Sequence, residues 1–172
     1  MKIRITGVDK ALRHSEDLLS SMRGKVKEFM EKLAQVGIDT ASARFSTAQY
    51  DGVNDVVVSS APEWDGENKL RIYAVGNAVG FIEFGTGVHY TEPHPKAAEF
   101  GAIRGSYGYG LGRLDSWRYR GEPGTDGEII TEGRHKGMIL TYGNPPARAM
   151  YDASREMRDK IQEIAKEVFG HG

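Results

Sequence analysis

The sequence has 172 residues, of which 39% are hydrophobic and 27% are charged, a composition typical of a globular domain rather than a disordered chain. The 23 Lys and Arg nearly balance the 24 Asp and Glu, and this formal net charge of -1 argues against a surface that binds nucleic acid throughout. Because the sequence contains no Cys, disulfides, thiolate zinc sites and a cysteine nucleophile are excluded.

The first residues, Met1-Lys2-Ile3-Arg4-Ile5, do not begin an apolar stretch of the length that a signal peptide or a membrane span needs. We therefore expect a protein that is made in a cytosol and does not associate with membranes.

The first predicted element is a helix from about Asp9 to Gln35, with Gly37 as its C-terminal stop. Apolar residues recur along it at steps of three, four and seven, which is the spacing of one helix face. These residues are Leu12, Leu19, Met22, Val26, Phe29, Met30, Leu33 and Val36. The opposite face carries charges of both signs, as a solvated surface does.

Strand patterns follow this helix. Residues Ala41–Tyr50 alternate loosely, with Ala43 and Phe45 on one side, and the dipeptide Asp51-Gly52 predicts a turn. Further strands are predicted at 56–60, 70–75 and 138–142. Strands and helices do not alternate, so these segments predict an antiparallel sheet of three or four strands and disfavour a doubly wound fold.

A second helix is predicted after Pro145-Pro146, with Pro146 in its first turn and Gly170 at its exit. Its apolar stripe consists of Met150, Ala153, Met157, Ile161, Ile164 and Val168. The expected fold class is therefore α+β: a single domain over residues 1–172, in which a small antiparallel sheet packs with long N- and C-terminal helices.

Residues 86–136 form a long insertion without a sustained hydrophobic period. Eleven of the 22 glycines fall between Gly101 and Gly143. The insertion also contains six of the larger aromatic residues: Tyr90, Phe100, Tyr107, Tyr109, Trp117 and Tyr119. Disordered linkers are poor in aromatic residues, so we expect partial order here, some of it gained on binding a partner.

Positive charge gathers in the first half of this insertion. Over residues 101–120 four arginines and one aspartate give a net charge of 4 − 1 = +3: Arg104, Arg113, Arg118, Arg120 and Asp115. Arginine interleaved with Tyr and Trp could contact phosphates and stack on bases. The same residues could equally form a protein interface, with Trp117 and Tyr119 as its buried anchors.

A metal site is the first of the chemical patterns to weigh. His89, Glu92 and His94 lie close together in the sequence, with Glu83 nearby, and His and carboxylate side chains are metal ligands. Their spacing matches no recognised site, and a surface or interface loop explains them as well. We expect no metal and no cofactor.

Catalytic and nucleotide-binding patterns are incomplete. Ser106, His135 and Asp126 could be imagined as a triad, but the sequence around Ser106 lacks the nucleophile-elbow order. Residues 108–112 resemble part of a dinucleotide fingerprint without its flanking strand and helix. We predict that the protein is not an enzyme; a small hydrolase that uses His89, His94 or His135 is the rival prediction.

Two segments carry a resemblance to a known family. The first is Ala78-Val79-Gly80-Phe81-Ile82-Glu83-Phe84-Gly85-Thr86-Gly87, in which Glu83–Thr86 is the signature. The second is Gly143-Asn144-Pro145-Pro146-Ala147-Arg148-Ala149-Met150, which leads into the last helix. Their order resembles that of the phage minor tail-component family, which comprises small tail-completion or head–tail joining proteins of long-tailed bacteriophages. Many shorter members pass from one motif to the other in far fewer residues, so the insertion departs from the family.

The resemblance implies a structural virion protein at the phage neck, made in the bacterial host cytoplasm. It implies a homo-oligomeric ring, most plausibly of six copies, around the DNA channel, in contact with other neck and tail proteins and with the genomic DNA. A nucleic-acid-binding module that uses residues 104–120 is the alternative function.

The residues of the first motif also have a physical interpretation. Phe81, Ile82 and Phe84 should anchor a short helical turn on the sheet, and Gly85 allows backbone angles that other residues avoid. A carboxylate between apolar anchors needs a partner. For Glu83 this is either an arginine of its own or a neighbouring chain, or a local cap or hydrogen bond to the loop backbone.

Overall fold

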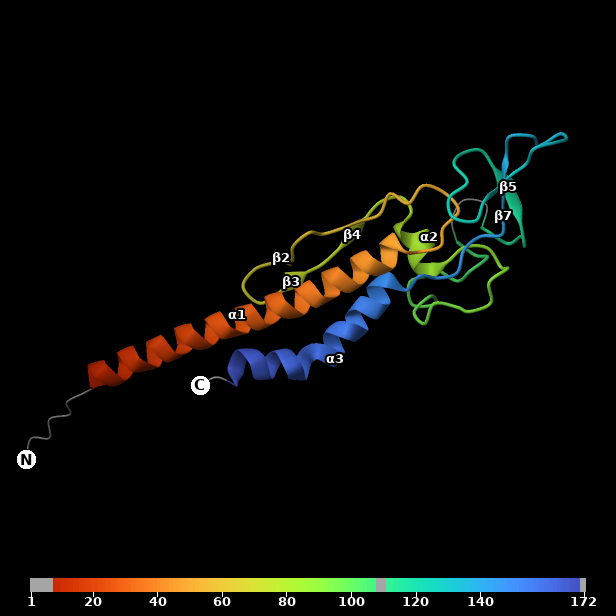
Figure 1. Cartoon of the computed structure of the whole chain (residues 1–172). Helices are drawn as coiled ribbons and strands as arrows, with labels where there is room; N and C mark the ends of the chain where they lie inside the picture. The colour runs from red at the N-terminus through yellow and green to blue at the C-terminus, as the bar shows by residue number, and fades with distance from the viewer. Residues whose placement is uncertain (1–7, 108–110, 171–172) are drawn as a thin grey trace, which may run out of the picture.

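The computed structural model describes residues 8–107 and 111–170, and the fold is α+β. Helix α1 (Val8–Ser46) runs along an elongated molecule, and α3 (Ala149–Phe169) packs against its second half in the antiparallel direction (Figure 1). Small antiparallel sheets and the short helix α2 (Val79–Phe84) complete the fold. Among the described residues no helix has both the length and the apolar character required to cross a membrane.

Helix α1 extends eleven residues beyond Gln35, so the strand predicted over Ala41–Tyr50 is wrong for most of its length. Ile38, Ala41 and Phe45 are buried at steps of three and four, which continues the helical period through the segment that we interpreted as alternating. The helix ends where the side-chain amide of Asn54 donates to the carbonyl of Phe45 over 2.8 Å.

Gly37, predicted as a helix stop, lies inside α1. A Cβ atom there would come within 2.7 Å of both Ile72 Cδ1 and Met157 Sδ. Gly37 therefore does not end the helix: it lets α1 lie close to the ends of the Ile72 and Met157 side chains. In contrast, a Cβ atom at Gly24 would meet nothing within 4 Å.

The predicted strand regions form three small sheets among the described residues, instead of one sheet of three or four strands. Strand β1 (Val57–Val58) pairs with β4 (Ala74–Val75), and β2 (Glu63–Trp64) pairs with β3 (Leu70–Arg71). These ribbons follow α1, where the Trp64 indole N–H donates to Glu31 over 3.1 Å. Contact with the helix, and not a wider sheet, thus buries one side of each ribbon.

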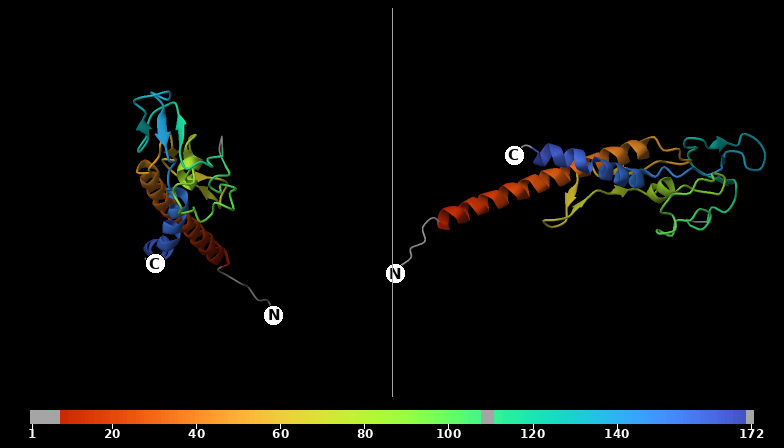
Figure 2. Two further views of the ribbon diagram at one scale, coloured as in Figure 1. Left: turned by 90° about the vertical axis from the view of Figure 1, so that its right-hand side faces the viewer. Right: turned by 90° about the horizontal axis from the view of Figure 1, so that it is seen from below.

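The third sheet lies at the opposite end from the N-terminus and has the order β5-β7-β6 (Figure 2). Strands β5 (Trp117–Tyr119) and β6 (Glu128–Ile129) belong to the insertion, and both pair with β7 (Ile139–Thr141). Thr125 N–H also donates to the carbonyl of Tyr50 over 2.9 Å. The insertion is therefore joined to the rest of the fold and cannot be removed without exposing β7.

Six buried residues form the core where the end of α1, the short α2 and the start of α3 meet: Ala41, Phe45, Ala78, Ile82, Ala149 and Ala153. Small side chains dominate this core, so the three helices approach closely. The expected helical turn forms as α2 with Ile82 fully buried, but it is anchored against α1 and α3 and not on the sheet. Phe81 and Phe84 are only half-buried.

The start of α3 differs from the prediction, because the helix begins at Ala149 and not at Pro146. Arg148 precedes it with a left-handed backbone (φ 56°, ψ 32°) and makes no side-chain cap. The predicted exit at Gly170 is correct: its N–H donates to the carbonyl of Lys166 over 2.9 Å.

The two helical glycines make a matched pair for a stability measurement. Gly37→Ala should lower the free energy of unfolding by about 1 kcal/mol, the lower end of overpacking costs, because the methyl group displaces the flexible ends of Ile72 and Met157 and this cost outweighs the gain in helix propensity. Gly24→Ala should raise it by about 0.5–1 kcal/mol, since the exposed site has room for the methyl group. Urea unfolding measures both; a stabilising Gly37→Ala would contradict the packing explanation.

Candidate functional site

The two sequence motifs lie side by side, although more than fifty residues separate them along the chain. We call residues 81–86 and 144–150 together the motif junction. Thr86 N–H donates to the carbonyl of Asn144 over 2.9 Å, and the Asn144 N–H donates to Thr86 Oγ1 over 3.1 Å. The fully buried Asn144 amide donates to the carbonyl of Phe81 over 3.0 Å. This side chain therefore links the segment after β7 to α2.

Glu83 connects α2 to α3. Its carboxylate oxygens accept hydrogen bonds from the backbone N–H of Met150 (2.9 Å) and of Tyr151 (3.1 Å). These N–H groups are in the first turn of α3, where an N-cap side chain would normally accept them. Glu83 is therefore a cap, as one interpretation held, but the helix that it caps is the distant α3 and not a local segment. No arginine pairs with its carboxylate within the described residues.

His94 completes the environment of Glu83. Its Nδ1 accepts the backbone N–H of Lys96 over 3.0 Å, so the ring proton belongs on Nε2, which donates to Glu83 Oε1 over 3.1 Å. The ring also packs edge-on against Phe84 at 4.6 Å between centroids. His94 thus positions a structural carboxylate from within the insertion.

Glycine is required on both sides of the motif junction. Gly85 has φ 77° and ψ 164°, a region that side chains exclude, and a Cβ there would lie 2.7 Å from Pro146 N. At Gly143, with φ 82°, a Cβ would lie 2.3 Å from the carbonyl oxygen of Thr86. The two backbone segments can approach this closely only because neither position carries a side chain.

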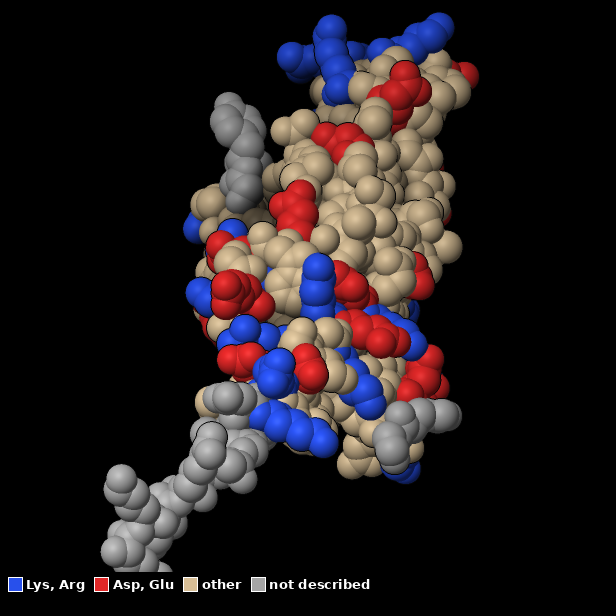
Figure 3. Space-filling view, turned by 90° about the vertical axis from the view of Figure 1, so that its left-hand side faces the viewer, with Lys and Arg blue, Asp and Glu red and all other residues tan. Residues whose placement is uncertain are grey.

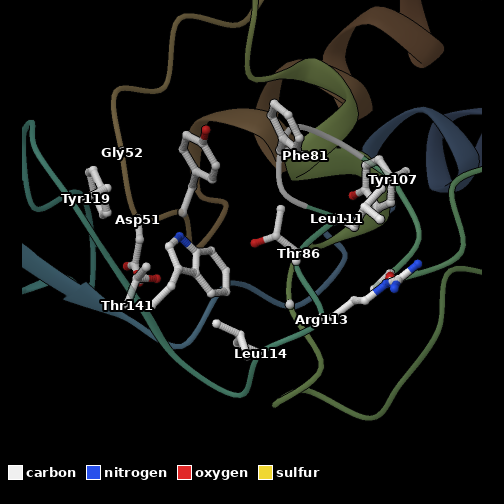
Figure 4. Close-up of a pocket in the computed structure, with 15 residues that line it drawn as sticks. Asp51, Gly52, Phe81, Thr86, Tyr107, Leu111, Arg113, Leu114, Tyr119 and Thr141 are labelled. Carbon is white, nitrogen blue, oxygen red and sulfur yellow. The ribbon is translucent and has the colours of Figure 1, made fainter.

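An open cavity of about 480 Å³ lies beside the motif junction and is walled by aromatic residues. We call it the aromatic cavity. Figure 4 shows Phe81 and Tyr107 on one side of it and Tyr119 and Thr141 on the other. Its further lining residues are Tyr50, Asp51, Gly52, Thr86, Gly87, Gly105, Leu111, Gly112, Arg113, Leu114 and Trp117.

The aromatic cavity presents phenol and indole groups more than charge. Burial raises the pKa of Tyr107 to about 12, and burial is also the main cause of the raised pKa of Tyr50 and of Tyr119. The Asp51 carboxylate accepts hydrogen bonds from Thr141 Oγ1 and from the Asp126 N–H. At neutral pH this surface suits an apolar or aromatic group with a polar edge.

The insertion's arginines and aromatic residues lie on different faces of β5. Trp117 and Tyr119 are half-buried and line the cavity, whereas Arg118 and Arg120 alternate with them and are exposed. The arginine and aromatic side chains therefore do not share one surface on which bases could stack as predicted. Trp117 and Tyr119 as buried anchors of a protein interface stay a prediction.

The other two arginines serve the fold of the insertion. Arg104 donates to the carbonyls of Gly87 (3.3 Å) and Glu92 (3.0 Å), and burial lowers the pKa of its guanidinium. Arg113 Nε donates to the carbonyl of Gly105 over 3.2 Å at the edge of the cavity. Only Arg118 and Arg120 of the predicted set are thus uncommitted, without an ion pair to any described residue.

The chemical patterns considered from the sequence are not assembled. Among the described residues no three His, Asp or Glu side chains converge as a metal site would require. His89 pairs with Asp115 at 3.2 Å, Glu92 lies 3.9 Å from Arg148, and His94 pairs with Glu83. Ser106 donates to the carbonyl of Ile103, so its hydroxyl is not directed to His135. Residues 108–110 lie outside the described part.

Sequence reasoning missed three residues that build this end of the molecule. Asp55 accepts the N–H of Asn77 and of Ala78 at the start of α2, both over 2.8 Å, and these hydrogen bonds lower its pKa. Asp51 was interpreted only as a turn residue, and Tyr107 only as one aromatic among several. None of these contacts has a signal in the sequence, because each partner lies more than twenty residues away.

Comparisons with protein-family models, with curated proteins and with solved structures find no match for this chain. The resemblance to the phage tail-component family therefore depends on the two motifs alone.

Removal of the Glu83 charge should destabilise the whole motif junction. Glu83→Gln keeps the shape but weakens the acceptor for two helix N–H groups, so we expect a loss of about 2 kcal/mol in the free energy of unfolding. Glu92→Gln makes the same chemical change at a side chain that is 80% exposed and should cost less than about 0.5 kcal/mol. Equal losses in urea unfolding would contradict the capping role.

The raised pKa of Tyr107 predicts a loss of stability in alkali. The unfolded phenol ionises near 10.0, so the stability present below that pH is lost as the pH rises through the folded value of about 12. The fall in unfolding free energy over this window should therefore be smaller in Tyr107→Phe. Tyr142→Phe controls for the loss of one phenol. If the unfolding free energy falls equally with pH in both variants and in the parent chain, Tyr107 is not the cause of the loss.

Proposed function

We propose that this chain is a structural protein of the neck of a tailed bacteriophage, where it joins or completes the tail at the head–tail interface. In this proposal several copies, most simply six, close into a ring around the DNA channel and contact other neck and tail proteins. The protein acts in the virion after synthesis in the bacterial cytoplasm, and it is not an enzyme.

The motif junction is the observation that carries the proposal. The residues that resemble the phage family come from two distant segments, and they form one hydrogen-bonded unit around Glu83 and Asn144. A unit with its own buried acceptors and with glycines at its closest approach is a fixed platform. In the proposed ring, the insertion that follows this platform is the segment that contacts neighbouring molecules.

The aromatic cavity supplies the contact to a neighbouring copy. An open cavity with Leu114 at 64% exposed and Trp117 half-buried leaves apolar surface in water, which a side chain from the next copy would cover. In a closed ring each copy uses one surface on the complementary surface of its neighbour. The cavity thus serves as the receiving surface.

Arg118 and Arg120 have a separate place in the proposal. Arg118 is exposed on the face of β5 that points away from the cavity, and Arg120, directly after the strand, is exposed as well. Both can therefore contact the genomic DNA while the aromatic side of the strand contacts protein. The same two residues are the basis of the alternative function, a nucleic-acid-binding module. Figure 3, seen from the side opposite this sheet, shows Lys, Arg, Asp and Glu interspersed over its lower half.

Native mass measurement over a concentration series, with negative-stain images, tests the ring. We expect closed rings of one copy number, and Leu114→Asp should abolish them because it places a charge at the cavity. Val57→Asp is the matched control, since Val57 is 62% exposed on β1 and lies outside the cavity lining. It should leave the rings intact.

Two outcomes would count against the proposal. A strict monomer that binds duplex DNA with micromolar or tighter affinity at physiological salt would favour the alternative function. Rings that form equally well in both variants would remove the aromatic cavity from the interface.

A further inference from the structure

The first half of α1 extends past the end of α3 and carries a row of apolar side chains (Figure 1). Phe169, the last residue of α3, packs against Phe29 with 5.8 Å between ring centroids. Before this point five large apolar residues of α1 are between 44% and 61% exposed: Leu12, Leu18, Leu19, Met22 and Val26. We call residues 12–26 the overhang.

The apolar residues of the overhang follow a heptad pattern. Leu12, Leu19 and Val26 are seven residues apart. Met22 and Phe29 follow Leu19 and Val26 by three residues each. This is the narrow stripe of a coiled-coil seam, with Leu12, Leu19 and Val26 at a and Ser15, Met22 and Phe29 at d. The seam continues into the contact that α3 already covers at Phe29, so the overhang is the uncovered part of one helix–helix interface.

We propose that the overhang pairs with the overhang of a second copy of this chain, in the antiparallel direction. In the register that we infer, Leu19 packs against Met22 of the second copy and Ser15 against Val26 of the second copy. Two-fold symmetry forms each of these layers twice. The partner helix then runs in the same direction as α3 and covers the seam where α3 ends.

The charges beside the seam select this register. Antiparallel coiled coils place e positions opposite e positions, and here Glu16 and Arg23 occupy them. The inferred register sets Glu16 against Arg23 of the second copy, twice. Neither residue has an ion pair with any other described residue of its own chain, so both are available for this contact.

The competing arrangements are less favourable. A shift of one heptad in one direction sets Glu16 against Glu16 of the second copy, and a shift in the other direction sets Arg23 against Arg23 of the second copy. A parallel pair would set Leu18, at a g position, against Arg23 and form no opposite-charge contact from these residues. Charge repulsion therefore opposes both neighbouring registers.

This pairing goes beyond the proposed neck function and does not depend on it. The overhang and the strands β5 and β7, which contribute Trp117, Tyr119 and Thr141 to the cavity lining, lie at opposite ends of the molecule (Figure 1). A two-fold contact at one end is compatible with a ring contact at the other, in which case two rings would be joined through their helices. The two contacts can therefore be tested separately.

Charge substitutions test the register. Glu16→Arg and Arg23→Glu each turn two attractive contacts into two repulsive ones, and each should raise the dissociation constant of the pair by about tenfold. The double variant restores opposite charges and should return to the parent value. Asp17→Arg is the matched control, because the f position faces away from the seam. Analytical ultracentrifugation in the Leu114→Asp background measures association without the cavity contact.

Cross-linking tests the direction of the pair, since the chain contains no Cys. Leu19→Cys mixed with Met22→Cys should give a disulfide between the two variants, and each variant alone should cross-link much less. Self-cross-linking of each variant would indicate a parallel pair and overturn the proposal, as would a monomer of 19.0 kDa that yields no cross-link. If rings form while cross-links fail, only this inference is lost.

Discussion

The carboxylate of Glu83 is the contact on which the rest of this structure depends. It is nearly buried, and it accepts N–H groups of α3's first turn together with the Nε2 proton of His94. Arg148 supplies no cap of its own, so α3 begins where α2 places an acceptor. The helix dipole of α3 further favours a negative charge at this point.

This one contact relates segments that no local preference would bring together. Because Glu83 joins α2 to α3, Thr86 and Asn144 lie close enough to form an isolated antiparallel β-bridge. This bridge places the residues after β7 beside the start of the insertion. Tyr107 returns from the insertion and donates its hydroxyl to the carbonyl of Gly85. The motif junction therefore places Phe81, Thr86 and Tyr107, which form one side of the open aromatic cavity.

The helices and the fold class could be predicted because their signals are local: apolar residues three and four apart mark α1 and α3. The limits of α1 could not, since a glycine such as Gly37 has the same sequence signal whether it ends a helix or admits Ile72 and Met157. For Glu83 the sequence predicted the need for a partner but not its identity. The cavity could not be predicted, because Tyr50, Phe81 and Trp117 meet only through tertiary contacts.

The alternation of β5 changes how the insertion's composition should be interpreted. A sequence with arginine and aromatic residues in turn suggests one mixed surface, as in proteins that bind single-stranded nucleic acid. Strand β5 places Arg118 on the face opposite Trp117 and Tyr119, which line the cavity, and Arg120, directly after the strand, is also exposed to solvent. In the proposed ring this separation is useful, because one strand can contact a neighbouring copy with one face and present positive charge to the DNA with the other.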